Sequence, residues 1–510
     1  MIDPKTPVLV GASWLNVRDG DAEPIDMMTE ASLGAAADSG GDILAFVRSV
    51  RVVKGFWRYK DPGRLVAERL GLDAVETVMT PFGGNEVYDL VGRTAQDIAA
   101  GRLDAAIVCA AEFGRTRRAA SKAGVKPRRY EEPVDAAPDL VTGEEKELSN
   151  AVENAAGLMV PTFFYAMAET SLRHRRRESI DEHRLRVSEL WASAAAVASD
   201  NPHAWLRDGA TASDIGTVSE SNRMVASPYT KLMTANVNVD QGASVIMCSA
   251  AVADAAGVPR DKWVFPYAAT GAAEHWYPSE RWALDESPAM RIAAERCLEL
   301  ADISVDDVDL LDLYSCFPSA VQLAQAGLAI DPSRPFTITG GLTFSGGPLN
   351  CYCIQALTRA IELLRERRTT AFLTGNGGFF TKHSCLVLGS SEPKSPFVVE
   401  RPQAEVDALP RRRGSEQRSA DGTVEAYTVI FGRAGAAESA IVAVIDDAGD
   451  RWFANTNDPD DLAEMLATDM VGASVSVERV SSPGEEIDKA VVTFRRLQQD
   501  PDRGSGEPQD

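Results

Sequence analysis

A turn with two glycines stands between an apolar run and a helix-like run in residues 80–90, TPFGGNEVYDL. Enzymes often mount a nucleophile on such a turn, yet this one carries no cysteine, serine or histidine. Gly83 and Gly84 would let a ligand approach the backbone, Asn85 is a candidate helix cap, and the first N–H groups of that helix would attract negative charge. These residues predict an oxyanion-binding turn without a nucleophile, although tight packing alone would also explain both glycines.

A second glycine pair repeats the plan of the first. The first unit runs from Asn85 through VYDLVGRTAQDIAAG to the buried-strand pattern DAAIVCAAE, and GGPLNCYCIQALTRAIELLRERRTTAFLTGNGG has the same succession of glycines, helix and strand. We expect a helix to begin near Gly347 and, with Gly346, to present N–H groups from the other half of a duplicated structure. Asn376 and Gly377, at the end of the second strand, complete the expected backbone site. Two such helix ends facing one cavity would hold a negatively charged oxygen.

The elements around these units predict an α/β protein with several domains. At 510 residues the chain is too long for one ordinary core. Short apolar runs alternate with helical patterns, and we predict an N-terminal half over residues 1–250, with a polar insertion at about 113–235, and a second half over residues 251–392. Within the insertion, RHRRRESIDEHR, which contains His174 and His183, predicts a solvated helix.

A small β domain is predicted beyond these halves. After a linker over residues 393–420, the segments TVEAYTVIF, ESAIVAVID, RWFANT, ASVSVERV and AVVTF give five strand candidates within residues 421–497, and the helix DDLAEMLATDM interrupts them. The pattern fits an OB-like barrel, although other small β folds fit about as well. We expect a module that covers a ligand, binds a partner or only packs. Residues 498–510 predict a disordered tail.

The composition argues against several classes of function. Hydrophobic residues make up 45% of the chain and charged residues 25%, as in soluble globular proteins, and the formal net charge of −23 argues against nucleic-acid binding. The sequence predicts neither a secretory leader nor a membrane span, so we expect a cytoplasmic protein without membrane insertion. Seven cysteines without dense spacing predict reduced thiols. Cys351 and Cys353 alone are a weak zinc signal, so no metal site is expected.

Four stretches, in the same order, resemble the thiolase superfamily over about residues 5–392. GGNEVYDLVGRTAQDIAAG with DAAIVCAAE resembles the thiolase nucleophile turn, helix and following strand, and LYSCFPSAV sits where thiolases carry Asn-Glu-Ala-Phe or His-Asp-Cys-Phe. GGLTFSGGPLN is similar to the Gly-His-Pro block, and LTGNGGFFTKH to the Cys-x-Gly block. The resemblance implies the thiolase fold, two duplicated βαβ-rich halves layered α/β/α/β/α. With its appended domain, the chain resembles the thiolase-like proteins of type 1.

The resemblance also implies that the positions of thiolase chemistry have changed. The nucleophilic cysteine falls on Gly84, the histidine of Gly-His-Pro on Gly347, the Asn or His of the third block on Tyr314, and the second cysteine near Thr374 or Gly375. Glycine cannot form the acyl-cysteine intermediate. We therefore predict a CoA thioester as substrate or ligand, no covalently bound cofactor and no conventional thiolase activity.

Three side chains are candidates for the remaining chemistry. Tyr314 is expected to donate a hydrogen bond in the site or, with a lowered pKa, to move a proton. Tyr88, one turn into the first helix, is a weaker candidate, and His383 in the Cys-x-Gly block is a candidate acid or base near neutral pH. Each of the three residues is alternatively a satisfied core side chain.

Two classes of function remain open. Retro-aldol cleavage of a β-hydroxyacyl-CoA needs a base and an oxyanion site but no cysteine. The alternative is a non-catalytic protein that binds CoA or acyl-CoA, or a structural subunit of a thiolase-like complex.

A basic cluster, FGRTRRAASKAGVKPRR, packs seven basic residues into the region that receives the coenzyme in thiolases. The resemblance implies CoA phosphate contacts from five of them, Arg115, Arg117, Arg118, Lys122 and Lys126. An exposed basic loop would give the same sequence pattern. Thiolases usually dimerise through their core, so we expect a homodimer or, because of the added domain, a monomer.

Overall fold

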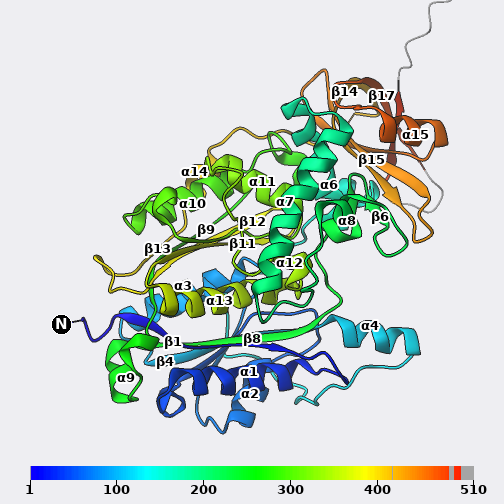
Figure 1. Cartoon of the computed structure of the whole chain (residues 1–510). Helices are drawn as coiled ribbons and strands as arrows, with labels where there is room; N and C mark the ends of the chain where they lie inside the picture. Colours follow the sequence, from blue (N-terminus) through cyan, green and yellow to red (C-terminus); the bar gives the residue numbers. More distant parts are fainter. Residues whose placement is uncertain (1, 416, 482–486, 495–510) are drawn as a thin grey trace, which may run out of the picture.

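The computed structural model describes residues 2–415, 417–481 and 487–494. In these residues two mixed sheets are stacked, with helices outside and between them, and a smaller β domain lies at one end (Figure 1). The tail predicted for residues 498–510 lies outside the described residues.

The first sheet has the strand order β1-β8-β4-β2-β3-β5. Its strands are β1 (Pro7–Asn16), β2 (Ser49–Val52), β3 (Glu76–Met79), β4 (Ala105–Phe113), β5 (Leu140–Val141) and β8 (Asp240–Ser249). β4 and β8 are buried along their whole lengths. Strands covered on both faces are expected to have near-continuous apolar sequences, as AAIVCAAEF has in β4.

The second sheet repeats the central plan of the first. Its order is β10-β11-β12-β9-β13, with β9 (Phe265–Ala273), β10 (Leu310–Asp312), β11 (Thr370–Gly377), β12 (Lys382–Gly389) and β13 (Val398–Glu400). β2 runs parallel to β4, which is antiparallel to β8, which is antiparallel to β1. β10, β11, β12 and β9 pair in the same succession of directions. The predicted duplication is therefore present in the pairing itself.

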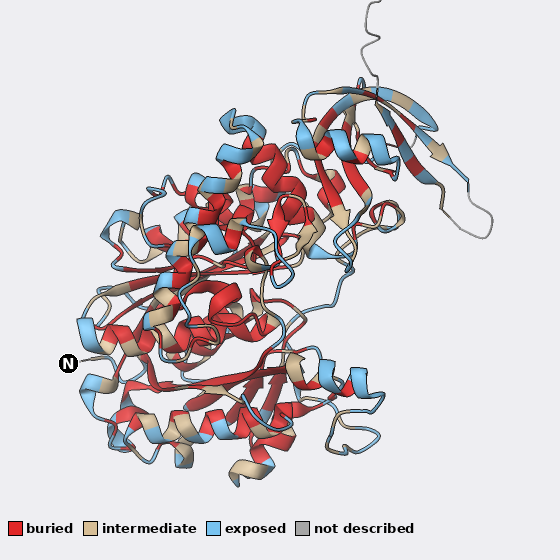
Figure 2. Ribbon diagram, turned by 45° about the vertical axis from the view of Figure 1, so that its right-hand side comes forward, coloured by how far each residue is buried: buried red, intermediate tan, exposed pale blue. Residues whose placement is uncertain are grey.

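Helices form three further layers around the sheets (Figure 1). α1 (Pro24–Ser39), α2 (Pro62–Leu70) and α9 (Ala250–Ala255) pack on the first sheet, and α10 (Pro288–Leu300), α11 (Pro318–Gly327) and α14 (Gln403–Asp407) lie on the far side of the second. α3 (Glu86–Ala99) and α13 (Tyr352–Arg367) lie between the sheets and contact strands of both. Figure 2 shows this central layer mostly in the colour of buried residues. The layering places the N-terminus of α3 inside the molecule.

The insertion between β4 and β8 is mainly helical. It contains α4 (Gly114–Ala123), α5 (Ala151–Ala155), α6 (Pro161–Arg176), α7 (Ile180–Asp200) and α8 (Ala212–Gly216), with the short strands β6 (Met224–Ala226) and β7 (Tyr229–Thr230). The single solvated helix predicted for RHRRRESIDEHR is wrong. α6 ends before Arg177, which has a φ of 58°, and Ser179 caps α7. His183, in α7, is only 1% exposed.

In the residues that the structure describes, the C-terminal β domain is a closed barrel of five strands. Its strands are β14 (Ser419–Phe431), β15 (Ala437–Asp446), β16 (Arg451–Thr456), β17 (Ser474–Val480) and β18 (Lys489–Phe494), in the order β15-β16-β18-β17-β14 with β14 also pairing with β15. The helix α15 (Pro459–Ala467) lies between the third and fourth strands. This arrangement confirms the prediction of a fold with a small OB-like β domain.

The barrel is tied to the rest of the molecule by buried polar contacts. β14 pairs with β6 of the insertion. The Arg173 guanidinium of α6 donates to the Tyr427 hydroxyl at 2.8 Å and to Asp469 at 2.8 Å. Arg451, only 1% exposed, donates to Glu425 at 2.6 Å and to the Pro278 carbonyl at 3.0 Å. The barrel is therefore packed against the core and the insertion.

The linker predicted for residues 393–420 is only partly irregular. Within it, β13 joins the second sheet beside β9, and α14 packs against α10 and β9. Three residues were too few to give a strand pattern in the sequence, and the strand forms because the edge of β9 is free to pair with it.

Candidate functional site

The turn before α3 is tightly enclosed. A methyl group on Gly84 would lie 2.6 Å from the Asn376 carbonyl oxygen and 2.9 Å from the Tyr314 hydroxyl oxygen. On Gly83 a methyl group would lie 2.6 Å from Lys382 Nζ. Both glycines are buried. Residues of the second half therefore occupy the space into which a side chain at position 84 would project.

The strand end predicted to complete the site lies against the same turn. A methyl group on Gly375 would be 3.2 Å from the Asn85 Cα and 2.8 Å from Ser384 Oγ, and one on Gly377 would be 3.3 Å from the Gly83 Cα. The structure thus brings Gly83, Asn85 and Gly377 together as the sequence predicted. At Gly375, one of the two candidate positions for the second thiolase cysteine, it leaves no space for a cysteine side chain.

Asn85 stands at the cap position of α3 but does not cap the helix. Its φ and ψ are −59° and −28°, already helical, and its side chain accepts no hydrogen bond from the first turn. The amide Nδ2 instead donates to Glu86 Oε1 at 3.0 Å and to Asp89 Oδ2 at 3.3 Å. The expectation of a capping asparagine was wrong because a cap needs extended backbone dihedrals.

Tyr314 lies at the predicted place, directly beside Gly84. It follows β10, its backbone N–H donates to Thr374 Oγ1 at 2.9 Å, and its ring meets that of Tyr352 edge to face with centroids 5.6 Å apart. The residue is half-buried. Burial raises the pKa of Tyr314 well above its usual value, the opposite of the lowered pKa considered from the sequence. The phenol therefore stays protonated at neutral pH and is suited to donate a hydrogen bond.

Tyr88 is a core residue of α3. It is 1% exposed, its ring edge faces Gly375, and burial raises the pKa of its hydroxyl well above the usual value. Its hydroxyl oxygen has no hydrogen-bond partner among the described residues. A protonated, enclosed phenol of this kind does not exchange protons with solvent readily.

His383 does not face the turn, which overturns its assignment as an acid or base near neutral pH. Successive strand residues point to opposite faces, so Lys382 and Ser384 of β12 face α3 while His383 faces away. Its Nε2 lies 3.1 Å from the Phe380 carbonyl oxygen and 3.3 Å from Ser287 Oγ. Burial, helped by the Arg281 charge, lowers the pKa of His383 to about 3. The ring is therefore neutral and structural.

Two ionisable residues at the turn were missed from the sequence. Lys382 Nζ donates to the Phe82 carbonyl oxygen and lies 3.9 Å from Glu86 Oε1, and each side chain is 13% exposed. Burial, with the nearby charge of Asp89, raises the pKa of Glu86 to about 7. Lys382 belongs to the quoted LTGNGGFFTKH block, but only pairing of β11 with β12 brings it to the turn.

The second glycine pair forms a turn of a different kind. The Gly347 N–H donates to the Asn236 carbonyl at 2.9 Å, and Gly346 has a φ of 111° with Gln241 Oε1 only 2.2 Å from the position of a methyl group. The helix expected to begin near Gly347 begins at Tyr352, after a 3-10 turn over Leu349–Cys351. The N–H group of Gly347 is already used by the fold, so it is not available to a ligand.

The basic cluster divides into paired and free residues. Arg115 lies 3.0 Å from the fully buried carboxylate of Asp240, and Arg117 donates to the Phe56 carbonyl at 2.8 Å. The remaining three predicted CoA-binding residues are exposed, and they are Arg118, Lys122 and Lys126. All five residues lie on or just after α4, which projects from the molecule (Figure 1).

Aromatic rings connect α4 with the glycine turn. The Arg117 guanidinium lies 4.6 Å from the centroid of the Phe56 ring, and that ring meets Phe82 with centroids 6.3 Å apart. Phe82 precedes Gly83, and Phe56 is 61% exposed. A surface path of apolar rings thus leads from the basic helix to the turn.

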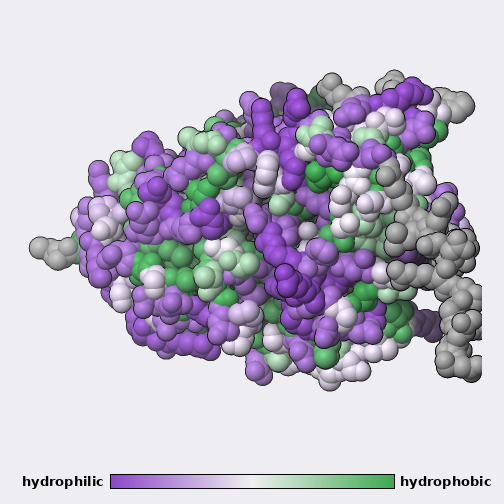
Figure 3. Space-filling view, turned by 90° about the horizontal axis from the view of Figure 1, so that it is seen from above, coloured by the Kyte–Doolittle hydropathy of each residue, from purple (hydrophilic) through white to green (hydrophobic). Residues whose placement is uncertain are grey.

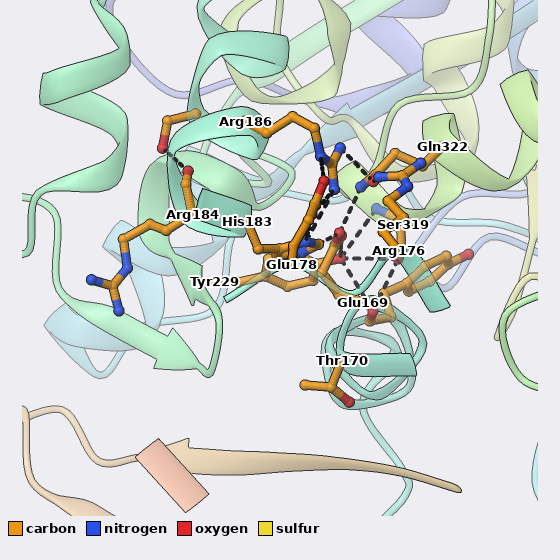
Figure 4. A network of polar contacts seen from close by, with 12 residues as sticks. Glu169, Thr170, Arg176, Glu178, His183, Arg184, Arg186, Tyr229, Ser319 and Gln322 are labelled. Atoms are coloured by element: carbon orange, nitrogen blue, oxygen red, sulfur yellow. Dashed lines mark hydrogen bonds and ion pairs between the residues drawn. The ribbon is translucent and has the colours of Figure 1, made fainter. Parts of the chain in front are cut away.

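A buried polar network joins residues of the insertion to Ser319 and Gln322 of α11 (Figure 4). His183 Nε2 lies 2.9 Å from Glu169 Oε1 and Nδ1 lies 2.7 Å from Glu178 Oε2, while Tyr229 and Gln322 each donate to Glu169 at 2.6 Å. Burial of Glu169 disfavours its charged carboxylate, but hydrogen bonds from His183, Tyr229 and Gln322 hold the pKa of Glu169 below its usual value.

The network ends next to the site. The Tyr229 hydroxyl oxygen lies 2.9 Å from Ser319 Oγ, and Ser319 Oγ donates to the Tyr165 carbonyl at 2.9 Å. The Tyr165 hydroxyl lies 3.1 Å from Asn376 Nδ2. The backbone oxygen of Asn376 is the atom that closes the space at Gly84.

Cysteine chemistry has no favourable place in the structure. All seven cysteines belong to the described part of the chain, and all are buried and unpaired. Burial raises the pKa of Cys316 to about 12, so its thiol is a poor nucleophile at neutral pH. Cys351 and Cys353 are core residues of the segment that starts α13.

A surface groove of the molecule lies away from both glycine turns. A groove of about 960 Å³ opens between the segment after α5 and strands β14, β16 and β18, and its lining includes no residue of either glycine turn. On the face seen in Figure 3, hydrophobic residues gather in separate patches between hydrophilic ones. In the described part of the chain, no helix is long and apolar enough to cross a membrane.

Comparison with known proteins finds similarity over almost the whole chain. Residues 402–480 match the family model described as thiolase-like protein type 1 additional C-terminal domain. The crystal structure of a monomeric SCP2-thiolase like protein type 1 from Mycobacterium smegmatis has a TM-score of 0.82 and 29% identity, and the match covers 96% of this chain and 100% of that one. The chain is therefore similar to thiolase-like proteins of type 1 over almost its whole length, and its residues 402–480 match their additional C-terminal domain.

A curated protein and a second solved structure are similar to the chain at lower identity. An acetyl-CoA acetyltransferase from Methanothermobacter thermautotrophicus is 24% identical over 360 residues, which are 67% of this chain and 85% of that protein. The Ltp2-ChsH2(DUF35) aldolase has a TM-score of 0.58 at 17% identity and covers 76% of this chain and 98% of its own, which shows a shared fold. These matches confirm the resemblance and the fold class predicted from the four motif blocks.

Proposed function

We propose that this thiolase-like protein binds a CoA thioester at the α3 turn and cleaves a β-hydroxyacyl thioester without forming an acyl-enzyme. The observation that carries the proposal is the enclosure of Gly84, where the Tyr314 hydroxyl and the Asn376 carbonyl stand 2.9 and 2.6 Å from the position of a side-chain carbon. A covalent route needs a nucleophile at this position. A hydrogen-bond donor there supports charge stabilisation instead.

Retro-aldol cleavage fits these groups. A base takes the proton of the β-hydroxyl, the bond between the α and β carbons breaks, and its electron pair moves onto the thioester as an enolate. The protonated Tyr314 phenol would donate to the enolate oxygen, a kind of contribution often worth about 10²–10³ in turnover. Return of the proton to the α carbon completes the reaction, giving an aldehyde or ketone and a shortened acyl-CoA.

The relatives support a CoA thioester as the substrate class. One carries the name acetyl-CoA acetyltransferase, and another of the same fold is an aldolase in a complex with a DUF35 protein. For the phosphates of CoA we propose the exposed residues of the basic cluster, Arg118, Lys122 and Lys126, because Arg115 and Arg117 are bonded within the protein. The rings of Phe56 and Phe82 would then flank the pantetheine.

A second candidate function is binding of acyl-CoA without catalysis. The observation that favours it is that the space beside Gly84 and the space beside Gly375 are both filled, since a side chain at Gly375 would also meet Asn85 and Ser384. A site without nucleophiles at these positions can bind a thioester without converting it.

One experiment separates the two functions. The purified protein is incubated with a panel of β-hydroxyacyl-CoA and β-ketoacyl-CoA thioesters, products are followed by mass spectrometry, and binding is measured by calorimetry. Release of an aldehyde or ketone with no acylated protein supports the retro-aldol function. Binding without any product selects the non-catalytic function, and an acylated protein overturns the non-covalent chemistry.

A further inference from the structure

Lys382 and Glu86 meet at the turn where the thiolase fold carries its nucleophile. Lys382 is the first residue of β12 and Glu86 the first of α3. Lys382 Nζ lies 2.6 Å from the position that a methyl group on Gly83 would take, and a methyl group on Gly377 would be 3.0 Å from Lys382 Cε. Two glycines thus make the space through which the ammonium group reaches the turn.

The geometry is not that of a tight structural ion pair. Lys382 Nζ and Glu86 Oε1 are 3.9 Å apart, whereas charge-assisted N–H···O bonds are about 2.7–2.9 Å long. Both side chains retain 13% exposure, so solvent reaches the pair. Beside them, Asn85 is 4% exposed, and its Oδ1 has no hydrogen-bond partner within the described chain. A buried acceptor without a donor is costly, so it indicates a group supplied from outside.

Several charged groups surround the pair. Asp89 lies on α3 and accepts from Arg401 at 2.8 Å, and Glu145 approaches from the loop over the turn, where it accepts from the Phe82 N–H at 3.0 Å. Burial lowers the pKa of Lys382 against the opposing influence of Glu86, Glu145 and Asp89. Burial and Asp89 bring the pKa of Glu86 to about 7 against Lys382 and Arg401. Near neutral pH, Glu86 is therefore balanced between its two protonation states.

We propose that Glu86 and Lys382 form the acid–base pair of this site. The inference rests on the proposed retro-aldol function and names the groups that move its proton. The Glu86 carboxylate takes the β-hydroxyl proton, the electron pair of the broken carbon–carbon bond moves to the thioester oxygen, and Glu86 returns the proton to the α carbon. The Lys382 ammonium stabilises the negative charge of the reacting groups during both proton transfers, while Tyr314 donates to the enolate oxygen.

The first test measures whether Lys382 lies at the bound thioester, and it needs no turnover. The protein is treated with acetic anhydride with and without a saturating acyl-CoA, and modified peptides are quantified by mass spectrometry. Lys394, whose side chain is 86% exposed, is the internal control. We expect bound acyl-CoA to slow acetylation of Lys382 at least about tenfold without affecting Lys394. If calorimetry detects binding of acyl-CoA but Lys382 is not protected, the inference is wrong and the binding function stands. If calorimetry detects no binding, both the inference and the binding function are wrong.

The second test uses turnover and matched variants. Glu86→Gln should lower the release of aldehyde or ketone by about 10²–10⁴-fold, the usual contribution of a general base, with the dissociation constant unchanged. Glu144→Gln, at an exposed carboxylate in the neighbouring loop, should have no effect. Lys382→Met should move the acidic limb of the pH profile of kcat/KM to higher pH, and Lys382→Arg should restore its position. Unchanged turnover in Glu86→Gln, or an unmoved limb in Lys382→Met, overturns the proposal.

Discussion

Adding one methyl group at Gly84 tests how completely the nucleophile position has been closed. Gly84→Ala would place a carbon 2.6 Å from the Asn376 backbone oxygen and 2.9 Å from the Tyr314 hydroxyl. The tyrosine can rotate, but the backbone oxygen belongs to β11 and cannot move without breaking strand pairing. Overpacking of this kind usually costs about 1–3 kcal/mol of unfolding free energy.

Gly414→Ala is the matched control. An added methyl group there has a single neighbour, Ser279 Cβ at 3.9 Å, and the residue is exposed. We expect the control to be neutral or stabilised by about 0.4–1 kcal/mol, because alanine restricts the unfolded chain. Urea unfolding of both variants, followed by tryptophan fluorescence, gives the difference between them.

Gly84→Cys extends the test to chemistry. We expect the same loss of stability and no acyl-enzyme with acetyl-CoA, because position 347 is glycine and no histidine is available there to form the thiolate. Intact-protein mass spectrometry after incubation with acetyl-CoA detects an added acetyl group. The reasoning fails if Gly84→Ala is as stable as Gly414→Ala, or if the cysteine variant is acetylated at position 84.

The remaining predictions concern the basic helix and the buried network. Replacing Arg118, Lys122 and Lys126 together by Gln should raise the dissociation constant for CoA at low salt without changing stability, and an unchanged constant in calorimetry would remove this assignment. Arg115→Gln should instead destabilise the protein in urea unfolding, because it removes the positive charge beside the fully buried Asp240 carboxylate, which keeps its hydrogen bonds from Thr116. Glu169→Gln should cost about 3–5 kcal/mol at pH 7. Because the folded pKa of Glu169 is depressed, the wild type loses that contribution as pH falls through it, so the difference between wild type and variant should shrink in acid. A difference that grows in acid would contradict this reasoning.

Much of the fold was predictable because it depends on local patterns that repeat. The glycine turn, the helix VYDLVGRTAQDIAAG and the strand AAIVCAAEF follow from composition and periodicity, and their second copy indicates duplication. The five strands of the barrel were found for the same reason. β13 was missed because three residues carry no periodicity, and its pairing with β9 is a long-range contact.

The proximity of Gly84 and Tyr314 was predictable from the sequence, whereas the protonation of the residues around them was not. The order of the motif blocks predicts that Gly84 and Tyr314 lie close together, and the structure places them in contact. His383 and Lys382 are neighbours in sequence, and only strand alternation decides which of them faces α3. Their pKa values likewise depend on the charges and the solvent around each group. A local sequence pattern carries no information about either.

The sequence by itself determined that no cysteine stands at positions 84 or 375, that the chain is acidic, and that duplicated α/β units precede a small β domain. Only the tertiary structure decided that Tyr314, Asn376 and Lys382 fill the space beside the turn and that Glu86 lies against an ammonium group. The physical reason is that periodicity and residue type act over a few neighbouring residues. The enclosure of the turn arises from the packing of two sheets and the helices between them, across almost 300 residues of chain.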